Sequence, residues 1–386
     1  MIKQLSFYLI MLAIMVAILE LFAFTAAKLI DQDDFFDTRQ SVYARLTAEN
    51  LATFKARSAD PVTGWHNWGP QVREEDNCLG EPVEYSYDAG GARLHDNFDP
   101  QATRIIIVGD SYTNGDEAGD NDTYPAKLSQ KLGVSVANHG VGGYGPTQAL
   151  LNLQENISRY PEAKVAVLGI MYENVYRMMN SYRPVLYSTS SDFTLKPYMS
   201  NGEIVPHPGS QVFDSLEQFK RAADVTFDND FWAKPVAGFP YLVALGKSLN
   251  SNYFIYRKLQ KTLRKAGMPE YQMVFADEEI QRNLVALLNQ FADMSQQWGV
   301  QPVVIFIPRN ELDISSASEF IEQHRSQFDA RLVIGDVAEV GDIDWLKFNL
   351  REERGDNICH PSSYGYQTIA DYIARLMREN EVWPAP

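Results

Sequence analysis

Residues 104–115 read Arg104-Ile-Ile-Ile-Val-Gly-Asp-Ser-Tyr-Thr-Asn-Gly115, an apolar β-branched run followed at once by small and polar residues. Such a run predicts a buried strand, and the Gly-Asp-Ser that ends it predicts a turn. In an open α/β sheet, ligands bind beyond the carboxyl ends of the strands, so Ser111 lies where a reactive hydroxyl would be useful. The alternative is that Gly109-Asp110-Ser111 is an ordinary turn or helix N-cap.

Short apolar runs of the same kind recur along the chain. The predicted strands span residues 104–108, 134–137, 165–170, 303–307 and 332–334, with helix-like segments between and after them. Because several of these runs are apolar at nearly every position, helices should cover both faces of the sheet. The sequence therefore predicts an α/β fold, a three-layer α/β/α sandwich with a parallel sheet of about five strands.

The third and fourth predicted strands are well over a hundred residues apart, which is too far for a single crossover. We interpret residues 176–275 as an inserted, mainly helical cap, with helical patterns over 215–223 and 241–265. Residues 278–298 have apolar positions at helical spacing and are expected to return the chain to the sheet.

The chain before residue 101 is expected to form two parts. Residues 1–30 are an N-terminal membrane anchor or signal peptide, and residues 31–100 are a lead-in that packs on the α/β domain of residues 101–386. In the lead-in, residues 38–57 look helical. Residues 60–100 are rich in Gly, Pro, Asn and Asp and look extended, with turns.

The N-terminal part is apolar enough to cross a membrane. Phe7–Ala27 contains one charged residue, Glu20, and at about 1.5 Å per residue it spans roughly the hydrocarbon core of a bilayer. Lys3 precedes the run and the next basic residue is Lys28, which predicts a cytoplasmic N-terminus. The small residues at 25–27 also suit a cleaved signal peptide. We favour a retained single-pass anchor in a bacterial inner membrane, with the body in the periplasm, because the run exceeds a usual signal-peptide core.

Charge and cysteine content restrict partners and cofactors. The formal net charge of -16 and the pI near 4.8 would repel phosphate backbones, so nucleic acid is not an expected partner. Cys78 and Cys359 fit either one disulfide in an oxidising compartment or two free buried thiols. The sequence has no Cys/His set with zinc spacing, so no structural metal site is expected.

A glycine-rich block, Asn138-His-Gly-Val-Gly-Gly-Tyr-Gly145, follows the second predicted strand and precedes a helix that starts near Pro146. Glycines there let the backbone approach a substrate and direct N–H groups at a developing negative charge. The block also satisfies the dinucleotide pattern G-x-G-x-x-G. That pattern belongs on the first strand of the sheet, which here ends in Gly109-Asp110-Ser111, so we do not favour the dinucleotide interpretation.

Two further polar segments follow predicted strands or precede a helix. The third predicted strand ends at Glu173-Asn174, where a side-chain amide could donate to an oxyanion or satisfy a loop. The segment Asp356-Asn357-Ile-Cys-His360 comes just before a C-terminal amphipathic helix. A serine nucleophile needs a histidine to remove its proton and an acid to fix the imidazole, and this segment offers both.

These four segments, in this order, resemble the four blocks of the SGNH (GDSL) hydrolase superfamily. The string Gly109-Asp-Ser-Tyr-Thr-Asn-Gly115, with Gly140-Val-Gly-Gly-Tyr-Gly145 behind it, is similar to bacterial members that have an N-terminal membrane helix, many encoded among polysaccharide genes. The likeness covers about residues 60–175 and 300–380.

The resemblance implies roles for individual residues. Ser111 is the nucleophile and His360 the general base. The oxyanion hole comprises the Ser111 and Gly143 backbone N–H groups and the Asn174 side chain. No cofactor or metal is implied.

Two positions depart from the family pattern. Asn174 is preceded by Glu173 and followed by Val175, where the family usually has Gly-x-Asn-Asp or Gly-Asn-Asp. The family acid lies three residues before the histidine, and that position holds Asn357, with Asp356 one residue further back. We expect Asp356 to be the acid, with Asn357 as a neutral alternative.

The expected reaction is hydrolysis of an ester through an acyl-enzyme, and the expected substrate carries a short acyl group, such as acetyl, on an extracytoplasmic glycan. Acyl transfer to a sugar is the close alternative, because a cap that shields the acyl-enzyme from water would favour transfer. A catalytically silent glycan-binding module is the third, although such a module would not need both Ser111 and His360. The sequence leaves the oligomeric state open.

Overall fold

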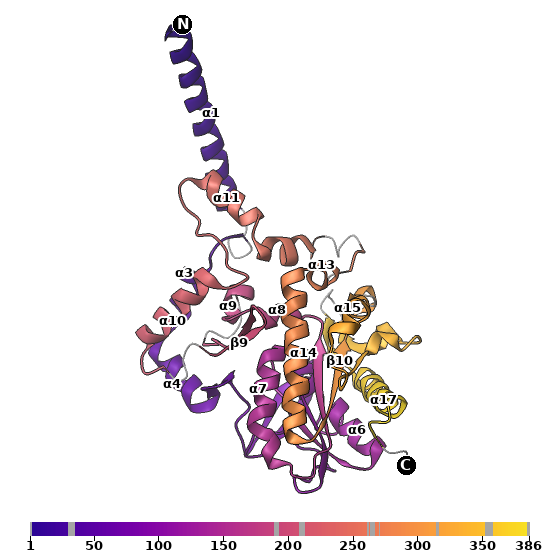
Figure 1. Ribbon diagram of the computed structural model, residues 1–386. Helices are drawn as coiled ribbons and strands as arrows, with labels where there is room; N and C mark the ends of the chain where they lie inside the picture. Colours follow the sequence, from indigo (N-terminus) through magenta and orange to yellow (C-terminus); the bar gives the residue numbers. More distant parts are fainter. Residues whose placement is uncertain are drawn as a thin grey trace.

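The centre of the molecule is a parallel sheet of five strands in the order β11-β10-β7-β5-β6 (Figure 1). The computed structural model describes residues 2–29, 35–188, 193–207, 213–260, 262, 267–269, 271–313, 316–351 and 358–383. The strands are β5 (Thr103–Gly109), β6 (Ser135–Gly140), β7 (Val165–Met171), β10 (Gln301–Ile307) and β11 (Val333–Asp336). Each overlaps a strand predicted from the sequence, so the predicted parallel sheet is confirmed.

Alternate residues of β5 contact opposite helix layers. Ile106 and Val108 belong to one buried apolar cluster, and Ile105 and Ile107 to another. Successive side chains of a strand point to opposite faces, so each cluster is the core between the sheet and one helix layer. The layers are α7 (Pro146–Asn156) and α14 (Glu278–Trp298) on one face, and α6 (Tyr124–Leu132) and α17 (Ser363–Glu379) on the other. The three-layer sandwich is confirmed, and α14 coincides with the predicted return helix.

The lead-in packs along the edge strand β6 and against the turn that follows Gly109-Asp110-Ser111. It contains helices and antiparallel hairpins: α3 (Arg39–Arg45), α4 (Ala48–Arg57), β1 (Ala59–Asp60), β2 (Gly64–Trp65), β3 (Gln71–Asp76) and β4 (Pro82–Tyr87). The single helical stretch expected over 38–57 is two helices, because Thr47 is extended and its side chain caps α4 by accepting from the Asn50 N–H at 3.1 Å. The extended character expected after residue 60 is confirmed.

The described part of residues 176–275, which we interpret as a cap, is mostly helical and also holds a short hairpin, and its first helix begins two residues earlier. Its elements are α8 (Asn174–Met178), α9 (Arg183–Leu186), β8 (Tyr198–Ser200), β9 (Glu203–Val205), α10 (Leu216–Asn229), α11 (Tyr241–Leu249), a π-helix (Phe254–Leu259) and α13 (Gln272–Phe275). The helix predicted over 241–265 is interrupted after Leu249 and resumes as the π-helix Phe254–Leu259, and residues 261 and 263–266 lie outside the described residues. After β10 come α15 (Ser316–His324), α16 (Trp345–Phe348), β12 (Asn349–Arg351) and β13 (Ile358–Pro361).

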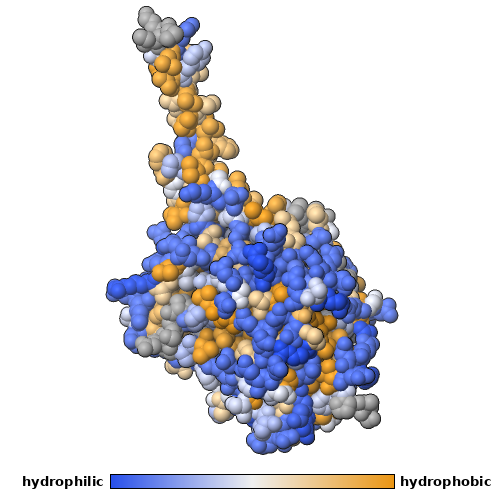
Figure 2. Space-filling view, viewed as in Figure 1, coloured by the Kyte–Doolittle hydropathy of each residue, from blue (hydrophilic) through white to orange (hydrophobic). Residues whose placement is uncertain are grey.

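The N-terminal helix α1 (Ile2–Leu29) extends away from the body. Its Gln4–Leu29 portion is long and apolar enough to cross a membrane, and only 6% of its most apolar window is buried. Figure 2 shows this helix as an apolar projection from a largely hydrophilic surface. The same composition also suits a signal sequence.

Arg93 is a buried polar link between the lead-in and the α/β domain. It is 1% exposed and donates to the carbonyl oxygens of Asn114 (2.8 Å), Gly115 (2.7 Å) and Ala118 (2.5 Å). Its Nε pairs with Asp120 at 3.0 Å. One buried guanidinium therefore holds the turn that follows the Gly-Asp-Ser segment.

We predict that Arg93→Met lowers the free energy of unfolding by about 3–5 kcal/mol, the usual effect of removing one partner of a buried charged network. Urea unfolding of the membrane-free body and of the variant measures the difference. Arg104→Met is the matched control, because Arg104 pairs with Glu162 on the surface and should change stability by less than about 1 kcal/mol. An equal change in both variants would contradict the role of Arg93.

Candidate active site

Ser111 begins a short helix, α5 (Ser111–Asn114), directly after β5. The Asp110 side chain caps this helix by accepting from the Tyr112 N–H at 3.0 Å. Two glycines let the helix lie tightly over the strand ends. A Cβ at Gly109 would lie 2.0 Å from Thr113 Oγ1, and a Cβ at Gly140 would lie 2.0 Å from Asn114 N.

Ser111 and His360 line one cavity of about 470 Å³. The structure thus brings together two residues that are far apart in the sequence. His360 lies on β13, and its ring packs edge-on against Tyr112, with ring centroids 5.7 Å apart. The cavity is lined by Phe54, Ser58, Trp65, Ser111, Asp116, Gly142, Gly143, Arg177, Arg183, Thr194 and His360.

Two carboxylates from the turn after α5 face His360. Glu117 Oε2 lies 3.4 Å from His360 Nδ1 and also accepts from the His360 backbone N–H at 2.9 Å. Asp116 Oδ2 lies 4.0 Å from Nε2. Asp356 and Asn357, the positions considered from the sequence, lie outside the described residues. Sequence reasoning missed Glu117, although a pair of acids so close after Ser111 must remain near it.

Glu117 has a φ of 67°, in the left-handed region that side chains other than glycine rarely adopt. Its N–H donates to the Tyr85 hydroxyl at 2.7 Å, and Arg93 binds the carbonyls on either side of it. The lead-in therefore supplies the groups that hold this conformation. A strained residue that is fixed from several sides is common at functional sites.

The charges at His360 alter its protonation. Burial lowers the pKa of His360, but the carboxylates of Glu117, Asp116 and Asp110 outweigh burial, and the net pKa is raised above its usual value. Burial raises the pKa of Glu117, but its contacts with His360 outweigh this, and the net pKa is lowered. Both shifts have the same cause, because the imidazolium and the Glu117 carboxylate stabilise each other's charged form.

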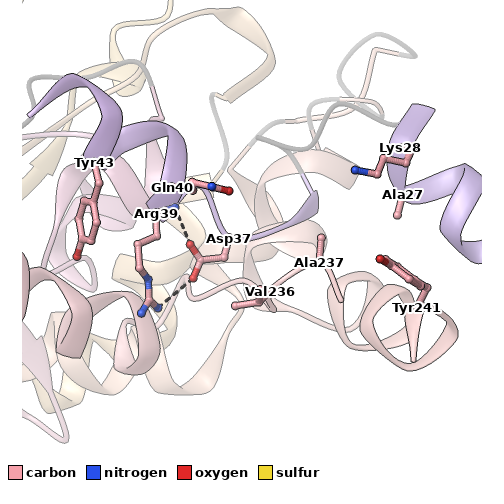
Figure 3. Close-up of a pocket in the computed structure, with 9 residues that line it drawn as sticks. All are labelled: Ala27, Lys28, Asp37, Arg39, Gln40, Tyr43, Val236, Ala237 and Tyr241. Carbon is pink, nitrogen blue, oxygen red and sulfur yellow. Dashed lines mark hydrogen bonds and ion pairs between the residues drawn. The ribbon is translucent and has the colours of Figure 1, made fainter. Parts of the chain in front are cut away.

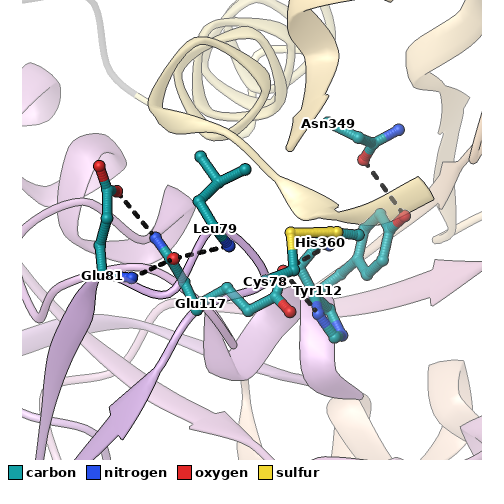
Figure 4. Close-up of a disulfide and its surroundings, with 9 residues drawn as sticks. Cys78, Leu79, Glu81, Tyr112, Glu117, Asn349 and His360 are labelled. Atoms are coloured by element: carbon teal, nitrogen blue, oxygen red, sulfur yellow. Dashed lines mark hydrogen bonds and ion pairs between the residues drawn. A yellow bond between two sulfur atoms is a disulfide. The ribbon is translucent and has the colours of Figure 1, made fainter. Parts of the chain in front are cut away.

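A disulfide links the lead-in to Cys359, the residue before His360. Cys78 and Cys359 are bonded, with their Cα atoms 6.4 Å apart, directly beside His360 and Glu117 (Figure 4). The sequence left the choice between a disulfide and free thiols open, and the structure contains the disulfide. The two sulfurs and a Glu117 oxygen lie within 4.8 Å of one another, but sulfurs bonded to each other are not thiolate metal ligands.

Two side chains from outside the glycine-rich loop after β6 donate hydrogen bonds to its carbonyl oxygens. The Trp65 indole donates to Gly142 O at 3.1 Å, and Arg183 Nη1 donates to Gly143 O at 2.6 Å. Among the described residues, the Gly142 and Gly143 N–H groups make no hydrogen bond to the protein. Gly143 has a φ of +81°, and a Cβ there would lie 1.8 Å from Arg183 Nη1.

Asn174, predicted as an oxyanion donor, is not among the residues that line the cavity. It is 1% exposed at the start of α8, and its Oδ1 accepts from Arg177 Nη1 at 3.1 Å. The cavity lining includes Arg177 and not Asn174. The Asn174 amide also interacts with Asp110, where its hydrogen bond opposes the rise that burial causes in the pKa of that carboxyl, so only the other amide N–H is available to an oxyanion.

Arg177 is a cavity residue that sequence reasoning missed. Its guanidinium lies 3.4 Å from Asp110 Oδ2 and 3.2 Å from Glu173 Oε1, and Glu173 also pairs with Arg309 at 3.3 Å. Burial raises the pKa of Glu173, but the nearby arginines outweigh this and hold it well below its usual range. This buried network connects Asp110, the N-cap residue of α5, to Arg177, which belongs to the inserted segment 176–275.

A second cavity, of about 520 Å³, lies near the end of α1. Lys28, Asp37, Arg39 and Tyr241 are among the residues around it (Figure 3). Its described lining contains no serine, cysteine or histidine, so the Ser111–His360 cavity is the candidate active site.

No family model matches the sequence, and no curated protein matches it. Solved structures give matches at low similarity. A G-D-S-L family protein from Desulfitobacterium hafniense, described as lipolytic, is 13% identical with a TM-score of 0.31, over 71% of this chain and 99% of that one. A family two carbohydrate esterase from Clostridium thermocellum, solved with cellohexaose, is 13% identical with a TM-score of 0.32, over 77% and 70%. An acetyl xylan esterase from Butyrivibrio proteoclasticus is 9% identical with a TM-score of 0.31, over 76% and 68%. Matches at these values do not assign a function to this chain.

We predict that an NMR titration of His360 gives a pKa above about 6.5, the value of an unperturbed histidine. Because the folded-state pKa is raised, protonation of His360 stabilises the fold fully below pH 6.5, and this contribution is lost as the pH rises through the folded pKa. Glu117→Gln should lower the His360 pKa by removing the nearest negative charge. An unchanged pKa in the variant would show that Glu117 does not interact with the imidazole.

Proposed function

We propose that this chain is a serine ester hydrolase that acts through an acyl-enzyme, with Ser111 as nucleophile and His360 as general base. The observation that carries the proposal is that both side chains line one cavity while a carboxylate lies against the Nδ1 side of the imidazole. A serine hydroxyl becomes reactive when a histidine takes its proton, and the carboxylate stabilises the imidazolium that forms. The resemblance to SGNH blocks agrees with these roles.

The reaction would proceed in two halves. His360 Nε2 takes the Ser111 proton as Oγ attacks the ester carbonyl, and the imidazolium then protonates the departing alcohol. Water attacks the acyl-enzyme with His360 again as base, which releases the acid and regenerates Ser111.

The developing oxyanion would be stabilised by the Ser111 and Gly143 N–H groups and the Asn174 amide. The carbonyl contacts of Trp65 and Arg183 fix the peptide planes of the loop, and the Gly143 N–H has no acceptor of its own among the described residues. Preorganised donors of this kind need no rearrangement when charge develops.

We propose Glu117 as the acid that positions His360. It contacts both the ring Nδ1 and the backbone N–H of His360. Asp356, the acid expected from the sequence, and Asn357 are the competing positions.

The proposed substrate is a short acyl ester, such as an acetyl group, on an extracytoplasmic glycan. Trp65 and Phe54 provide aromatic surface in the cavity, and Arg183 and Thr194 provide polar groups, a mixture that suits a sugar ring. Acyl transfer to a sugar is the alternative favoured by the cap, since Arg183 and Thr194 belong to the cap and line the cavity.

We propose that α1 is a retained single-pass anchor in a bacterial inner membrane and that the body lies in the periplasm. The Cys78–Cys359 disulfide supports an oxidising compartment. The helix is long enough to span the bilayer, with Lys3 on one side and Lys28 on the other.

We predict that Ser111→Ala and His360→Ala each lower turnover of acetylated sugars and short aryl esters by about four to six orders of magnitude, because the two residues act as one unit. Ester hydrolysis by the purified chain and circular dichroism of each variant measure activity and fold. Substantial turnover by folded Ser111→Ala would reject the serine mechanism.

We predict that Glu117→Gln lowers kcat by up to about ten thousandfold, the effect of converting the acid of a serine protease triad into its amide. Asp356→Asn and Asn357→Ala should change turnover little. A large loss in Asp356→Asn with none in Glu117→Gln would instead assign the acid to the position expected from the sequence.

We predict that Gly143→Ala lowers kcat by about a hundred- to a thousandfold, because the added methyl displaces an oxyanion donor. Gly142→Ala is the matched control, since its Cβ would meet only Asp116 Oδ2, at 3.3 Å. Equal losses in the two variants would mean that the loop tolerates no side chain at either position, and they would contradict a specific role of Gly143 as an oxyanion donor.

A further inference from the structure

Glu20, the single charge in the apolar run of α1, contacts another helix. Its Oε2 accepts from the Tyr241 N–H at 2.7 Å, and its Oε1 accepts from the Leu242 N–H at 3.4 Å. These are the first N–H groups of α11, which have no partner within that helix. A carboxylate also interacts favourably with the positive end of a helix. Glu20 therefore caps α11 from a different part of the chain.

Apolar contacts continue this junction. Phe24 packs edge-on against Tyr241, with ring centroids 5.0 Å apart. Ala27, Ala244 and Phe36 form a buried cluster separate from the two cores of the sandwich. The Ser248 hydroxyl donates to the Phe35 carbonyl oxygen. The buried face of α11 is thus attached to α1 and to the chain just after it, as Figure 1 also shows.

The contact with Glu20 fixes how deep α11 lies relative to the anchor. Lys28 is eight residues beyond Glu20, which is about 12 Å along the helix. A lysine at the end of a membrane helix places its amine among the headgroups. If Lys28 is at that level, the first turn of α11 lies closer to the bilayer centre than Lys28 does, among the acyl chains of the outer, periplasmic leaflet.

The opposite face of α11 and the loop before it are apolar and exposed. Leu242, Val243 and Leu249 have the spacing of one helix face. The exposed fractions are 67% for Val236, 80% for Phe239, 42% for Leu242, 50% for Val243 and 44% for Leu249. On α1, Leu21 and Phe22, next to Glu20, are 65% and 70% exposed. The two apolar surfaces lie on helices that are in contact.

We propose that residues 236–249 are a second membrane-contacting element, which inserts its apolar face among the acyl chains of the outer leaflet beside α1. This inference rests on the proposed anchor and is independent of the esterase proposal. It accounts for the charge in α1, because a carboxylate bound to helix N–H groups no longer faces lipid alone. It also requires α1 to be retained, because cleavage after Ala27 would remove Glu20.

Two contacts instead of one would orient the body on the membrane. A single helix would leave the domain free to rotate about the helix axis, whereas contact through both α1 and α11 would fix that rotation. The second cavity lies at this junction, with Lys28 and Arg39 on its walls (Figure 3). The polar groups around it would lie at the level of the headgroups.

The test uses the full chain in phospholipid vesicles, with a nitroxide attached at Val243→Cys. Val72→Cys is the matched control, because Val72 is 67% exposed on β3 of the lead-in. We expect the Val243 label to collide with oxygen dissolved in the lipid and to lose the collisions with a water-soluble nickel chelate that the Val72 label keeps. Equal access of the nickel chelate to both labels would overturn the proposal.

A second variant tests the capping contact. Glu20→Leu keeps α1 apolar and helical but removes the acceptor for the first turn of α11, so the Val243 label should gain collisions with the chelate. No change in the label would overturn the role of Glu20. The intact mass of the membrane-purified chain provides a further check, and loss of residues 1–27 would overturn the proposal without affecting the esterase assignment.

Discussion

The burial of Arg93 under the turn after α5 is the interaction on which the candidate site depends. That turn starts at the nucleophile helix and ends at Glu117, so its shape sets the distance between Ser111 and the carboxylate that faces His360. Arg93 comes from the lead-in, and so does Cys78, which is bonded to the residue before His360. The lead-in therefore holds both the nucleophile side and the base side of the cavity. An unpaired guanidinium is costly to bury, so the turn and Arg93 must be formed together.

The electrostatics of the cavity differ from those of the whole molecule. The chain has a formal net charge of -16, yet the cavity lining includes two arginines, Arg177 and Arg183. Arg177 is balanced by Asp110 and Glu173, whereas Arg183 has no ion pair among the described residues and bonds to a backbone carbonyl. Burial, with Arg177 nearby, lowers the pKa of Arg183 to about 10, so it remains charged at neutral pH. The cavity therefore contains an arginine whose charge no carboxylate of the described residues neutralises through an ion pair.

The sequence predicted the sheet well, because buried parallel strands have continuous apolar runs that need no tertiary information. It also predicted that Ser111 and His360 converge, because the carboxyl-end rule places Ser111 at the edge of the sheet and the resemblance pairs it with His360. It missed Glu117, whose approach to His360 depends on a left-handed turn held by Arg93 and Tyr85. Contacts between residues distant in the sequence, such as Glu20 with Tyr241 and Arg183 with Gly143, likewise have no local pattern.

The most direct test of the central claim is to treat the purified chain with a fluorophosphonate, which forms a stable bond with an activated serine, and to locate the adduct by peptide mass spectrometry. The account predicts one adduct per chain, on Ser111, and its loss when His360 is replaced by alanine. An adduct on another residue, or an enzyme that hydrolyses esters yet leaves Ser111 unmodified, would contradict it.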